Sequence, residues 1–379
     1  MKLFDRSSKN VVASWFWTVD RTMLLLIAAL IGYGIVLVAA ASPAVASRIG
    51  LSEQHFFLKH IIFLILSVSG MIFISFLSPR GLWRVAILVM GAGLVAMILI
   101  PFIGMEIKGA QRWIHLPFIS LQPSELVKPA LAIIAARLMA MQKEKEGFPG
   151  EIYAALLYAF IVMLLMAQPD FGMTFVVTCI VMSQIFMAGF RFKYLIYVAV
   201  GGVVALVLVY SSFDHVQSRV DRFFDPASGN TYQVDKSLES FRHGGVLGTG
   251  PGQGTVKLNL PDAHADFIFA VSGEELGLVF TLPLVGLYLF LLLHGFRKME
   301  ESEDLFAILA VGGLLTMVGV QAFIHMGSAL HILPAKGMTL PFISYGGTSL
   351  LSVGFAMGAV LSLTRHKTRT GIVSKRASR

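Results

Sequence analysis

The chain has 379 residues, of which 56% are hydrophobic and only 14% are charged, and its mean hydropathy is +0.76. A soluble protein carries roughly a quarter charged residues, so this composition excludes an ordinary soluble fold and indicates a protein of the lipid bilayer. The net charge of +8 is typical of the cytoplasmic Lys and Arg of membrane proteins, and without an aromatic–basic patch it excludes nucleic acid as a partner.

Apolar segments long enough to cross a bilayer, which takes roughly 20 residues, recur along the chain. We predict an all-α integral membrane protein with ten transmembrane helices at about 20–41, 55–77, 83–101, 123–141, 151–167, 171–189, 193–212, 267–296, 305–330 and 342–364. The fifth and sixth helices are separated only by QPDFG (168–172), where proline, aspartate and glycine favour a break. SPAVAS (42–47) resembles a signal-peptidase site, but the apolar run before it is long enough to span, so we expect an uncleaved first helix.

The distribution of positive charge orients these helices. With the N-terminus in the cytoplasm, most of the 30 Lys and Arg residues fall on inner segments, as the positive-inside rule requires. The prediction is a cytoplasmic N-terminal tail (1–19), a ten-helix domain (20–366) and a basic cytoplasmic C-terminal tail (367–379). One long outer loop, about 213–266, lies between the seventh and eighth helices, and loops of this length are usually functional or disordered.

Ionisable residues at membrane depth cost roughly 2.5–3.5 kcal/mol each, so they are functional or paired. In QPSELVKPA (122–130), Glu125 and Lys128 are three residues apart, share one helix face and can pair. Two interpretations carry equal weight: a structural ion pair, or a polar floor beneath a substrate cavity. Asp170, at the outer end of a neighbouring hairpin, could compete with Glu125 for Lys128.

More acids surround the start of the eighth helix, in NLPDAHADFIFAVSGEELG (259–277). Asp266 lies at the predicted helix N-terminus, where a carboxylate can accept from unpaired backbone N–H groups, so an ordinary N-cap is the plain structural interpretation. Glu274 and Glu275 lie eight and nine residues further along, about 12–13 Å on a helix. We interpret them as buried structural acids that other helices partner, whereas Asp262 and His264 belong to the loop.

Glycines and prolines mark two irregular segments. LPAKGMTLPFISYGGTS (333–349) places Ser344 and Tyr345 in non-helical backbone near membrane depth, which is tolerated only where it is buried in protein or lines a wet cavity. The glycine-rich stretch 244–254 offers backbone N–H groups that could face a phosphate, although no Walker A pattern follows. The sequence has no spacing of His, Cys, Asp or Glu that is typical of a metal site. The single cysteine, Cys179, excludes a disulfide within the chain.

Six motifs in this order resemble those of the SEDS family (shape, elongation, division, sporulation), the FtsW/RodA/SpoVE group of bacterial membrane proteins. They are GAQRWI (109–114), QPSELVK (122–128), QPDFG (168–172), YQVDKSLES (232–240), AHADFIFAVSGEELG (263–277) and KGMTLPFISYGGTS (336–349). The resemblance covers about 20–366 and is closer to the cell-division branch than to the elongation branch. Ala265 stands where many relatives have Thr or Ser, a mild departure that does not affect the neighbouring acid.

The resemblance implies a peptidoglycan glycosyltransferase that polymerises lipid II, an undecaprenyl-pyrophosphate-linked disaccharide-pentapeptide, into β-1,4-linked strands. It implies that the enzyme works on the outer face of the bacterial cytoplasmic (inner) membrane at the division septum. A class B penicillin-binding protein would supply the transpeptidase, alongside other membrane proteins of the division machinery. The family's essential aspartate matches Asp266, which we expect to be the general base for the acceptor's 4-hydroxyl.

Departure of the pyrophosphate needs positive charge, from Lys or Arg side chains or from a divalent cation such as Mg²⁺ or Mn²⁺. Arg112 ranks first because it lies in a family motif, and the other outer candidates are Arg219, Arg222, Arg242, Lys257 and Lys336. No metal-ligand set is expected. The expected substrate-binding residues are Arg112, Glu125, Lys128, Asp170, Ser237, His264, Lys336, Ser344 and Tyr345.

Two other functions fit the same sequence. A lipid II flippase would move the precursor without chemistry, along a path lined by Glu125, Lys128, Glu274 and Glu275. A non-catalytic scaffold of the division machinery would recruit the transpeptidase through its helices. Loss of glycan polymerisation on substitution of Asp266 would distinguish the enzyme from both.

Overall fold

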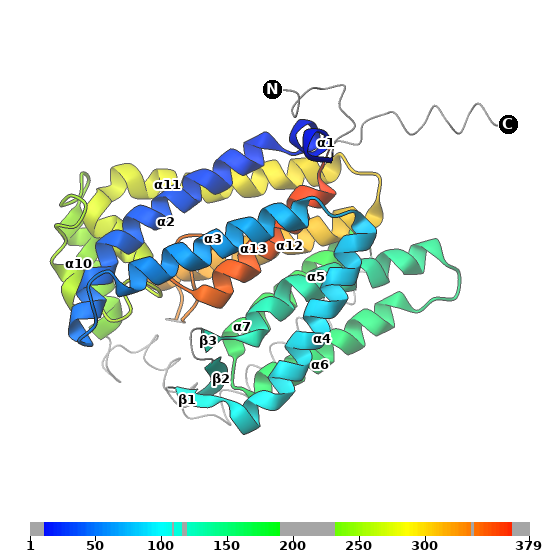
Figure 1. Cartoon of the computed structure of the whole chain (residues 1–379), viewed down its shortest axis with the longest axis horizontal. Coiled ribbons are helices and arrows are strands. Elements are labelled where there is room, and N and C mark those ends of the chain that lie inside the picture. Colours follow the sequence, from blue (N-terminus) through cyan, green and yellow to red (C-terminus); the bar gives the residue numbers. More distant parts are fainter. Residues whose placement is uncertain (1–10, 108–109, 116–119, 190–231, 335–336, 366–379) are drawn as a thin grey trace.

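The computed structural model describes residues 11–107, 110–115, 120–189, 232–334 and 337–365. Its long helices pack side by side in one bundle, with α10 at one end and α1 at the other (Figure 1). The helices are α1 (Val11–Thr18), α2 (Arg21–Arg48), α3 (His55–Ser75), α4 (Pro79–Ile103), α5 (Pro123–Glu144), α6 (Gly150–Ala167), α7 (Phe171–Met187), α10 (Tyr232–Gly244), the 3-10 helix η3 (Val256–Asn259), α11 (Ile268–Glu300), α12 (Leu305–Ala329) and α13 (Gly347–Leu363).

Six of the described helices are long and apolar enough to cross a bilayer, namely α2, α3, α4, α6, α11 and α12. The helices α7 and α13 are apolar but have 17 residues each. The predicted fourth span is α5, which carries charged residues at both ends. The chain is therefore a largely helical membrane protein, as predicted. The predicted seventh span, 193–212, lies outside the described residues.

Capping side chains explain where several helices begin. Asp20, Asp170 and Asp304 each accept a backbone hydrogen bond in the first turn of α2, α7 and α12, at 3.0, 3.2 and 3.1 Å. Ser78 does the same for α4 at 3.2 Å, and Pro79 is pre-organised for the first turn. This helix therefore begins four residues before the predicted start. The break between α6 and α7 falls within QPDFG, as predicted.

Two further helix ends differ from the prediction, and one predicted helix contains a break. The helix α2 runs through SPAVAS to Arg48, because a proline inside a helix removes only one backbone donor and the small residues around it stay helical. The last helix begins at Gly347 rather than 342, because Pro341 and its neighbours are held in the non-helical segment described below. The helix α11 is broken at Gly277, which has φ 65° and ψ −176°.

Two further elements were not predicted. In the connection between α4 and α5, the strands β1 (Met105–Ile107), β2 (Ala110–His115) and β3 (Ser120–Leu121) form an antiparallel sheet in that order. Figure 1 shows this sheet beside the end of α4. The predicted long outer loop contains α10, which packs against α11 through an aromatic contact between Phe241 and Phe269.

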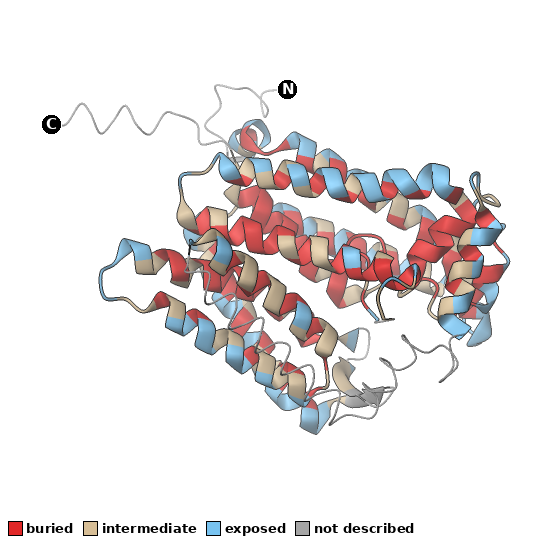
Figure 2. Cartoon of the chain, turned by 180° about the vertical axis from the view of Figure 1, so that it is seen from behind, coloured by how far each residue is buried: buried red, intermediate tan, exposed pale blue. Residues whose placement is uncertain are grey.

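The interior of the bundle lies around α5, α12 and α13. In α12, 72% of the most apolar stretch is buried, against 22–39% in the five other long apolar helices, so α12 is the central one of the six. Figure 2 shows buried residues along the inner helices and exposed residues on the outward faces. Gln184 of α7 donates to the carbonyl oxygens of Ala132 (2.6 Å) and Leu309 (3.1 Å), which joins α7 to α5 and α12.

Candidate active site

Asp266 lies in a tight turn just before α11. The N–H groups of Ala265 and Asp266 both donate to the carbonyl oxygen of Asp262 at 2.9 Å, and Asp262 has a φ of 51°. The N-cap of α11 is Phe267, which makes no side-chain cap, so the interpretation of Asp266 as an N-cap is wrong. Its carboxylate instead lies against Gly337, where an added Cβ would come within 3.0 Å of Oδ2.

The segment that faces Asp266, residues 337–346, is mostly buried and not helical. Tyr288 of α11 donates to the carbonyl oxygen of Pro341 at 2.5 Å, and Nδ1 of His325 in α12 donates to that of Met338 at 2.7 Å. Phe342 has a φ of 64°, and an added Cβ at Gly34 of α2 would come within 2.6 Å of its carbonyl oxygen. Three helices therefore hold this segment in place, as the sequence predicted for irregular backbone at this depth.

The turn before α11 and the 337–346 segment are bonded directly to each other. The N–H of Tyr345 donates to the carbonyl oxygen of His264 at 2.9 Å, and the Ser344 hydroxyl donates to that of Ala265 at 2.7 Å. The same hydroxyl accepts from the N–H of Leu340 at 2.8 Å. Ser344 thus joins the motif that contains Asp266 to the motif of 336–349, and its hydroxyl is bonded to backbone groups.

His264 is buried two residues from Asp266. Its ring contacts those of Phe56 and Tyr345, with centroids 4.3 and 5.0 Å apart. Burial lowers the pKa of His264 to about 4, although Asp262 raises it, and Arg48 lowers it further. The imidazole is therefore neutral at ordinary pH and packs as a ring in the wall of the site.

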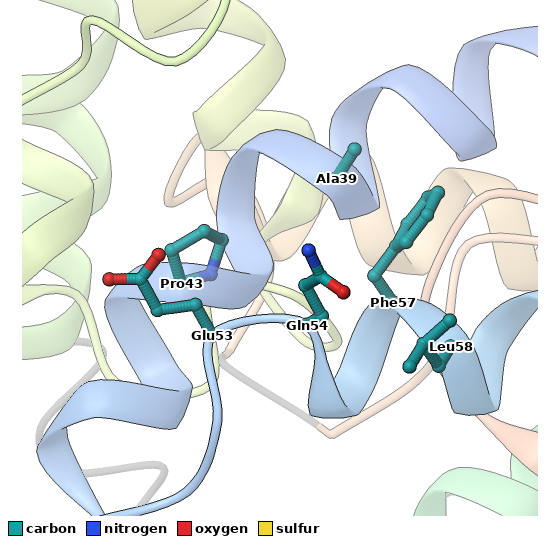
Figure 3. Close-up of a pocket in the computed structure, with 6 residues that line it drawn as sticks. All are labelled: Ala39, Pro43, Glu53, Gln54, Phe57 and Leu58. Atoms are coloured by element: carbon teal, nitrogen blue, oxygen red, sulfur yellow. The ribbon is translucent and has the colours of Figure 1, made fainter.

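A cavity of about 370 Å³ lies between the end of α2 and the start of α3 (Figure 3). It is lined by Ala39, Pro43, Glu53, Gln54, Phe57 and Leu58. Ser42 fixes this corner, because its hydroxyl donates to the carbonyl oxygen of Glu53 (2.8 Å) and accepts from the N–H of Phe57 (3.2 Å). The cavity and the ring that packs on His264 therefore share the first turn of α3.

Arg112 of β2 is committed to the connection between α6 and α7. Its Nε donates to the carbonyl oxygen of Gln168 at 3.0 Å, and its guanidinium also donates to that of Pro169. Its Nη1 lies 3.6 Å from Oδ1 of Asp170. The other carboxylate oxygen of Asp170, Oδ2, accepts from the Gln122 side chain at 3.4 Å. Arg112, ranked first as a pyrophosphate ligand, thus has protein partners for its donors, and it is Arg112 rather than Lys128 that pairs with Asp170.

Glu125 and Lys128 form the predicted ion pair on α5, with Nζ and Oε2 2.8 Å apart. Both side chains are buried, Lys128 completely. The pair lies next to α13, because Ser352 donates to the carbonyl oxygen of Glu125 at 2.6 Å. A buried pair of this kind is costly to break, since removing one partner leaves an uncompensated charge.

The remaining predicted residues are dispersed. Ser237 of α10 is buried and donates to the carbonyl oxygen of Ala329 at 2.7 Å, which holds α10 on α12. Arg242 is exposed on α10. Three of the expected cations, Arg219, Arg222 and Lys336, lie outside the described residues.

Glu274 and Glu275 are buried, as predicted, and their partners come from the segment 243–257, which includes the end of α10 and part of the 3-10 helix η3. Backbone N–H groups of Gly252, Val256 and Lys257 donate to the two carboxylates. Within the glycine-rich stretch 244–254, the N–H of Gly252 therefore faces the Glu275 carboxylate rather than a phosphate. The sequence analysis also missed the Lys257 ammonium as a partner of Glu275, although an acid pair in a mainly apolar run is a signal that a buried cation is needed.

The fold and the site define a helical membrane protein in which one carboxylate lies where a turn before a broken helix meets a buried non-helical segment. A family model described as "Cell cycle protein", FTSW_RODA_SPOVE, matches residues 21–369. The chain is 41% identical to the probable peptidoglycan glycosyltransferase FtsW of Caulobacter vibrioides, over 96% of this chain and 94% of that protein. It is 34% identical to the protein of the same name from Coxiella burnetii, over 92% and 96%.

Solved structures agree. A chain from work described as "Structural coordination of polymerization and crosslinking by a peptidoglycan synthase complex" matches with a TM-score of 0.75 and 28% identity, over 91% of this chain and 97% of that one. The rod shape determining protein RodA of Thermus thermophilus matches with a TM-score of 0.68 and 27% identity, over 92% and 98%. The chain belongs to the FtsW/RodA/SpoVE family, and the names of both relatives agree with the cell-division branch.

Proposed function

We propose that this protein is a peptidoglycan glycosyltransferase that polymerises lipid II into β-1,4-linked glycan strands. The observation that carries the proposal is the Asp266 carboxylate, which lies against Gly337 where two family motifs meet. Both relatives are named as probable peptidoglycan glycosyltransferases, which supports the same class of reaction.

Asp266 acts as the general base in this proposal. Its carboxylate takes the proton of the acceptor's 4-hydroxyl while that oxygen forms a bond to the anomeric carbon of the donor. The bond from that carbon to the pyrophosphate breaks, and undecaprenyl pyrophosphate leaves with the electron pair. An α-linked donor gives a β-linked product by one inversion, so a second carboxylate is not needed as a nucleophile.

The departing pyrophosphate needs positive charge beside it. Arg112 and Lys257 donate to protein groups, so we assign this role to Lys336, which directly precedes Gly337 in the chain. A divalent cation, Mg²⁺ or Mn²⁺, is the alternative source of charge. Over the described residues no three His, Cys, Asp or Glu side chains gather as a metal site.

The proposed topology has ten transmembrane helices in a domain of 20–366, with the tails 1–19 and 367–379 in the cytoplasm. Nine spans correspond to the described helices α2 to α7 and α11 to α13, and the tenth is 193–212. The distribution of Lys and Arg supports this orientation. It puts Asp266 and the loop of about 213–266 on the outer face of the bacterial cytoplasmic membrane, where we propose that the protein works at the division septum.

The proposed partner is a class B penicillin-binding protein, a transpeptidase that crosslinks the strands, together with other membrane proteins of the division machinery. The similarity to a chain of a synthase complex that combines polymerisation and crosslinking supports a transpeptidase partner. A lipid substrate and a membrane-embedded partner also fit a chain with many exposed apolar side chains on its helices.

The test is polymerisation of fluorescent lipid II by the purified protein with its transpeptidase partner, with moenomycin present to silence contaminating classical glycosyltransferases. Asp266→Asn keeps the shape of the side chain and removes the base, so we expect at least about a 100-fold loss of rate. Asp235→Asn, at an exposed carboxylate of α10, is the matched control and is expected to keep the wild-type rate.

An Asp266→Asn protein that polymerises at the wild-type rate would overturn the assignment of the base. Wild-type protein that moves lipid II across a liposome membrane without polymerising it would favour the flippase, to which the buried pair of Glu125 and Lys128 points. Protein that does neither but still binds the transpeptidase would favour the scaffold.

A further inference from the structure

The helix α11 is broken beside the candidate site, and the segment 244–257 forms hydrogen bonds with the backbone on both sides of the break. At Gly277 the backbone leaves helical geometry. We call residues 244–257 the strap. Its N–H groups at Thr249 and Gly250 donate to the carbonyl oxygens of Glu274 and Glu275, both at 3.0 Å. Backbone groups that a break in a helix leaves unpaired near a bilayer must find other partners. The strap supplies these hydrogen bonds to α11.

Bonds in the other direction complete the repair. The N–H groups of Leu278 and Val279, which begin the second half of α11, donate to the carbonyl oxygens of Gly245 and Val246 at 3.1 Å. Glycine is required for this approach, since an added Cβ at Gly248 would come within 2.3 Å of the carbonyl oxygen of Glu275. The start of the strap is therefore fixed mainly by backbone contacts, to which the Thr249 hydroxyl adds a hydrogen bond to the carbonyl oxygen of Glu274 at 3.2 Å.

The far end of the strap is fixed by charge. Lys257 is buried, and its ammonium forms an ion pair with Glu275 of α11. The same ammonium donates to the carbonyl oxygen of Ala40 in α2 at 2.9 Å. Its backbone N–H donates to Oε2 of Glu274 at 2.9 Å. One residue thus joins α2 to both acids of α11.

Lys257 lies in η3, and from the end of η3 the chain runs directly into the turn that carries Asp266. A second contact from α2 holds this stretch, because Nη2 of Arg48 donates to the carbonyl oxygen of Leu260 at 2.6 Å. The last residue of the strap and the turn are therefore both bonded to α2. The bond from Lys257 to Ala40 and the bond from Arg48 to Leu260 together set the position of the turn.

We propose that Lys257 is a positioning residue: by joining Glu275 to Ala40 it sets the place of the 258–266 turn, and hence of the Asp266 carboxylate. The inference rests on the proposed role of Asp266. Small displacements of a catalytic group are costly, since a shift of about 1 Å can lower a rate about 100-fold. Loss of Lys257 should therefore reduce turnover while the substrate still binds.

The experiment separates this positioning from mere neutralisation of a buried acid. Lys257→Met leaves Glu275 as an uncompensated buried charge, whereas Lys257→Met with Glu275→Gln removes both charges of the Lys257–Glu275 pair and leaves Glu274 with its own partners. We expect Lys257→Met to lower both the melting temperature and kcat, with kcat down about tenfold or more and KM for lipid II changed less than about twofold. The double variant should regain the melting temperature but not kcat, because the bond to Ala40 is still missing.

Two controls and a second measurement complete the design. Lys257→Arg keeps the charge and should recover part of kcat. Lys236→Met removes a lysine of α10 that pairs with Glu239 at 2.6 Å at the surface, and should change neither quantity. Hydrogen exchange of the peptide 258–267 reports on the turn without any activity, and should be about tenfold faster in both Lys257→Met and the double variant.

Recovery of both kcat and slow exchange in the double variant would overturn the inference, because Lys257 would then serve only to neutralise Glu275. A loss of kcat with unchanged exchange in the turn would overturn it too. If the wild-type protein does not polymerise lipid II, the proposed function fails, and the exchange of 258–267 still decides whether Lys257 places the turn.

Discussion

At the scale of single residues, the wall of the site is built from groups that are neutral and packed rather than charged and solvated. The imidazole of His264 lies against the rings of Phe56 and Tyr345, and its carbonyl oxygen accepts from the N–H of Tyr345. A protonated ring in this place would lose most of its hydration. Its burial is what lowers the pKa to about 4.

This burial predicts a dependence of stability on pH. The unfolded chain binds a proton at His264 near the ordinary pKa of 6.5, whereas the folded protein does so only near pH 4. Unfolding is therefore favoured as the pH falls from 6.5 to 4, by about 3 kcal/mol in all, and no such loss occurs above pH 6.5. The melting temperature should fall more between pH 7.5 and pH 4.5 in the wild type than in His264→Gln.

A control isolates this residue from the other histidines. His115→Gln removes an exposed ring on β2, which is solvated in the folded and the unfolded chain alike, and should keep the full wild-type dependence. Equal pH dependence in the wild type and His264→Gln would show that the ring is not the group responsible.

Local spacing predicted residue pairs well and distant partners poorly. The pair of Glu125 and Lys128 follows from helix geometry, because residues three apart share a face. The pairing of Asp170 with Arg112 joins residues far apart in the sequence and depends on a strand that apolar periodicity does not reveal. Lys257 was visible only as one cation among several, because its burial depends on how the strap folds back on α11.

At the scale of elements, α11 works as two helices joined by a glycine. Gly277 has φ 65° and ψ −176°, a conformation that is nearly restricted to glycine, and an added Cβ would come within 2.3 Å of the N–H nitrogen of Gly248. The strain alone costs about 1–3 kcal/mol in another residue, and the clash with the strap adds to it. Gly277→Ala should therefore reduce the yield of monodisperse protein in detergent and lower its melting temperature.

The matched control lies on the same helix. An added Cβ at Gly286 meets nothing within 4 Å, so Gly286→Ala should be neutral or stabilising by up to about 1 kcal/mol, the difference in helix propensity. If Gly277→Ala melted at the same temperature as Gly286→Ala, the break in α11 would not need a glycine.

Most helices were predictable because each contains a long apolar run, whereas the start of α4, which Ser78 caps, was missed by four residues. The break in α11 was not predictable, because Gly277 lies in an apolar run that continues on both sides and a single glycine is tolerated in such runs. The 337–346 segment was recognised as irregular from its prolines and glycines. Its contact with Asp266 followed only from the three-dimensional arrangement.

At the scale of the whole molecule, the proposed topology assigns each connection between helices to one side of the membrane. The chain enters 190–231 at the end of α7 and leaves it at the start of α10. The proposed topology puts the end of α7 inside and the strap outside. This sidedness is the one that the predicted seventh helix at 193–212 requires.

Single cysteines test this arrangement. In a Cys179→Ser background, Leu247→Cys on the strap should react in intact spheroplasts with a maleimide that does not cross membranes, because this side chain is 79% exposed. Glu146→Cys, between α5 and α6, and Glu301→Cys, between α11 and α12, replace exposed residues and should react only after permeabilisation. Protection of Leu247→Cys in intact spheroplasts would put the strap and Asp266 inside, and no lipid II presented on the outer face could then reach the carboxylate. Labelling of Glu146→Cys in intact cells, with Glu301→Cys protected, would instead place 190–231 on one side of the membrane and remove the seventh helix.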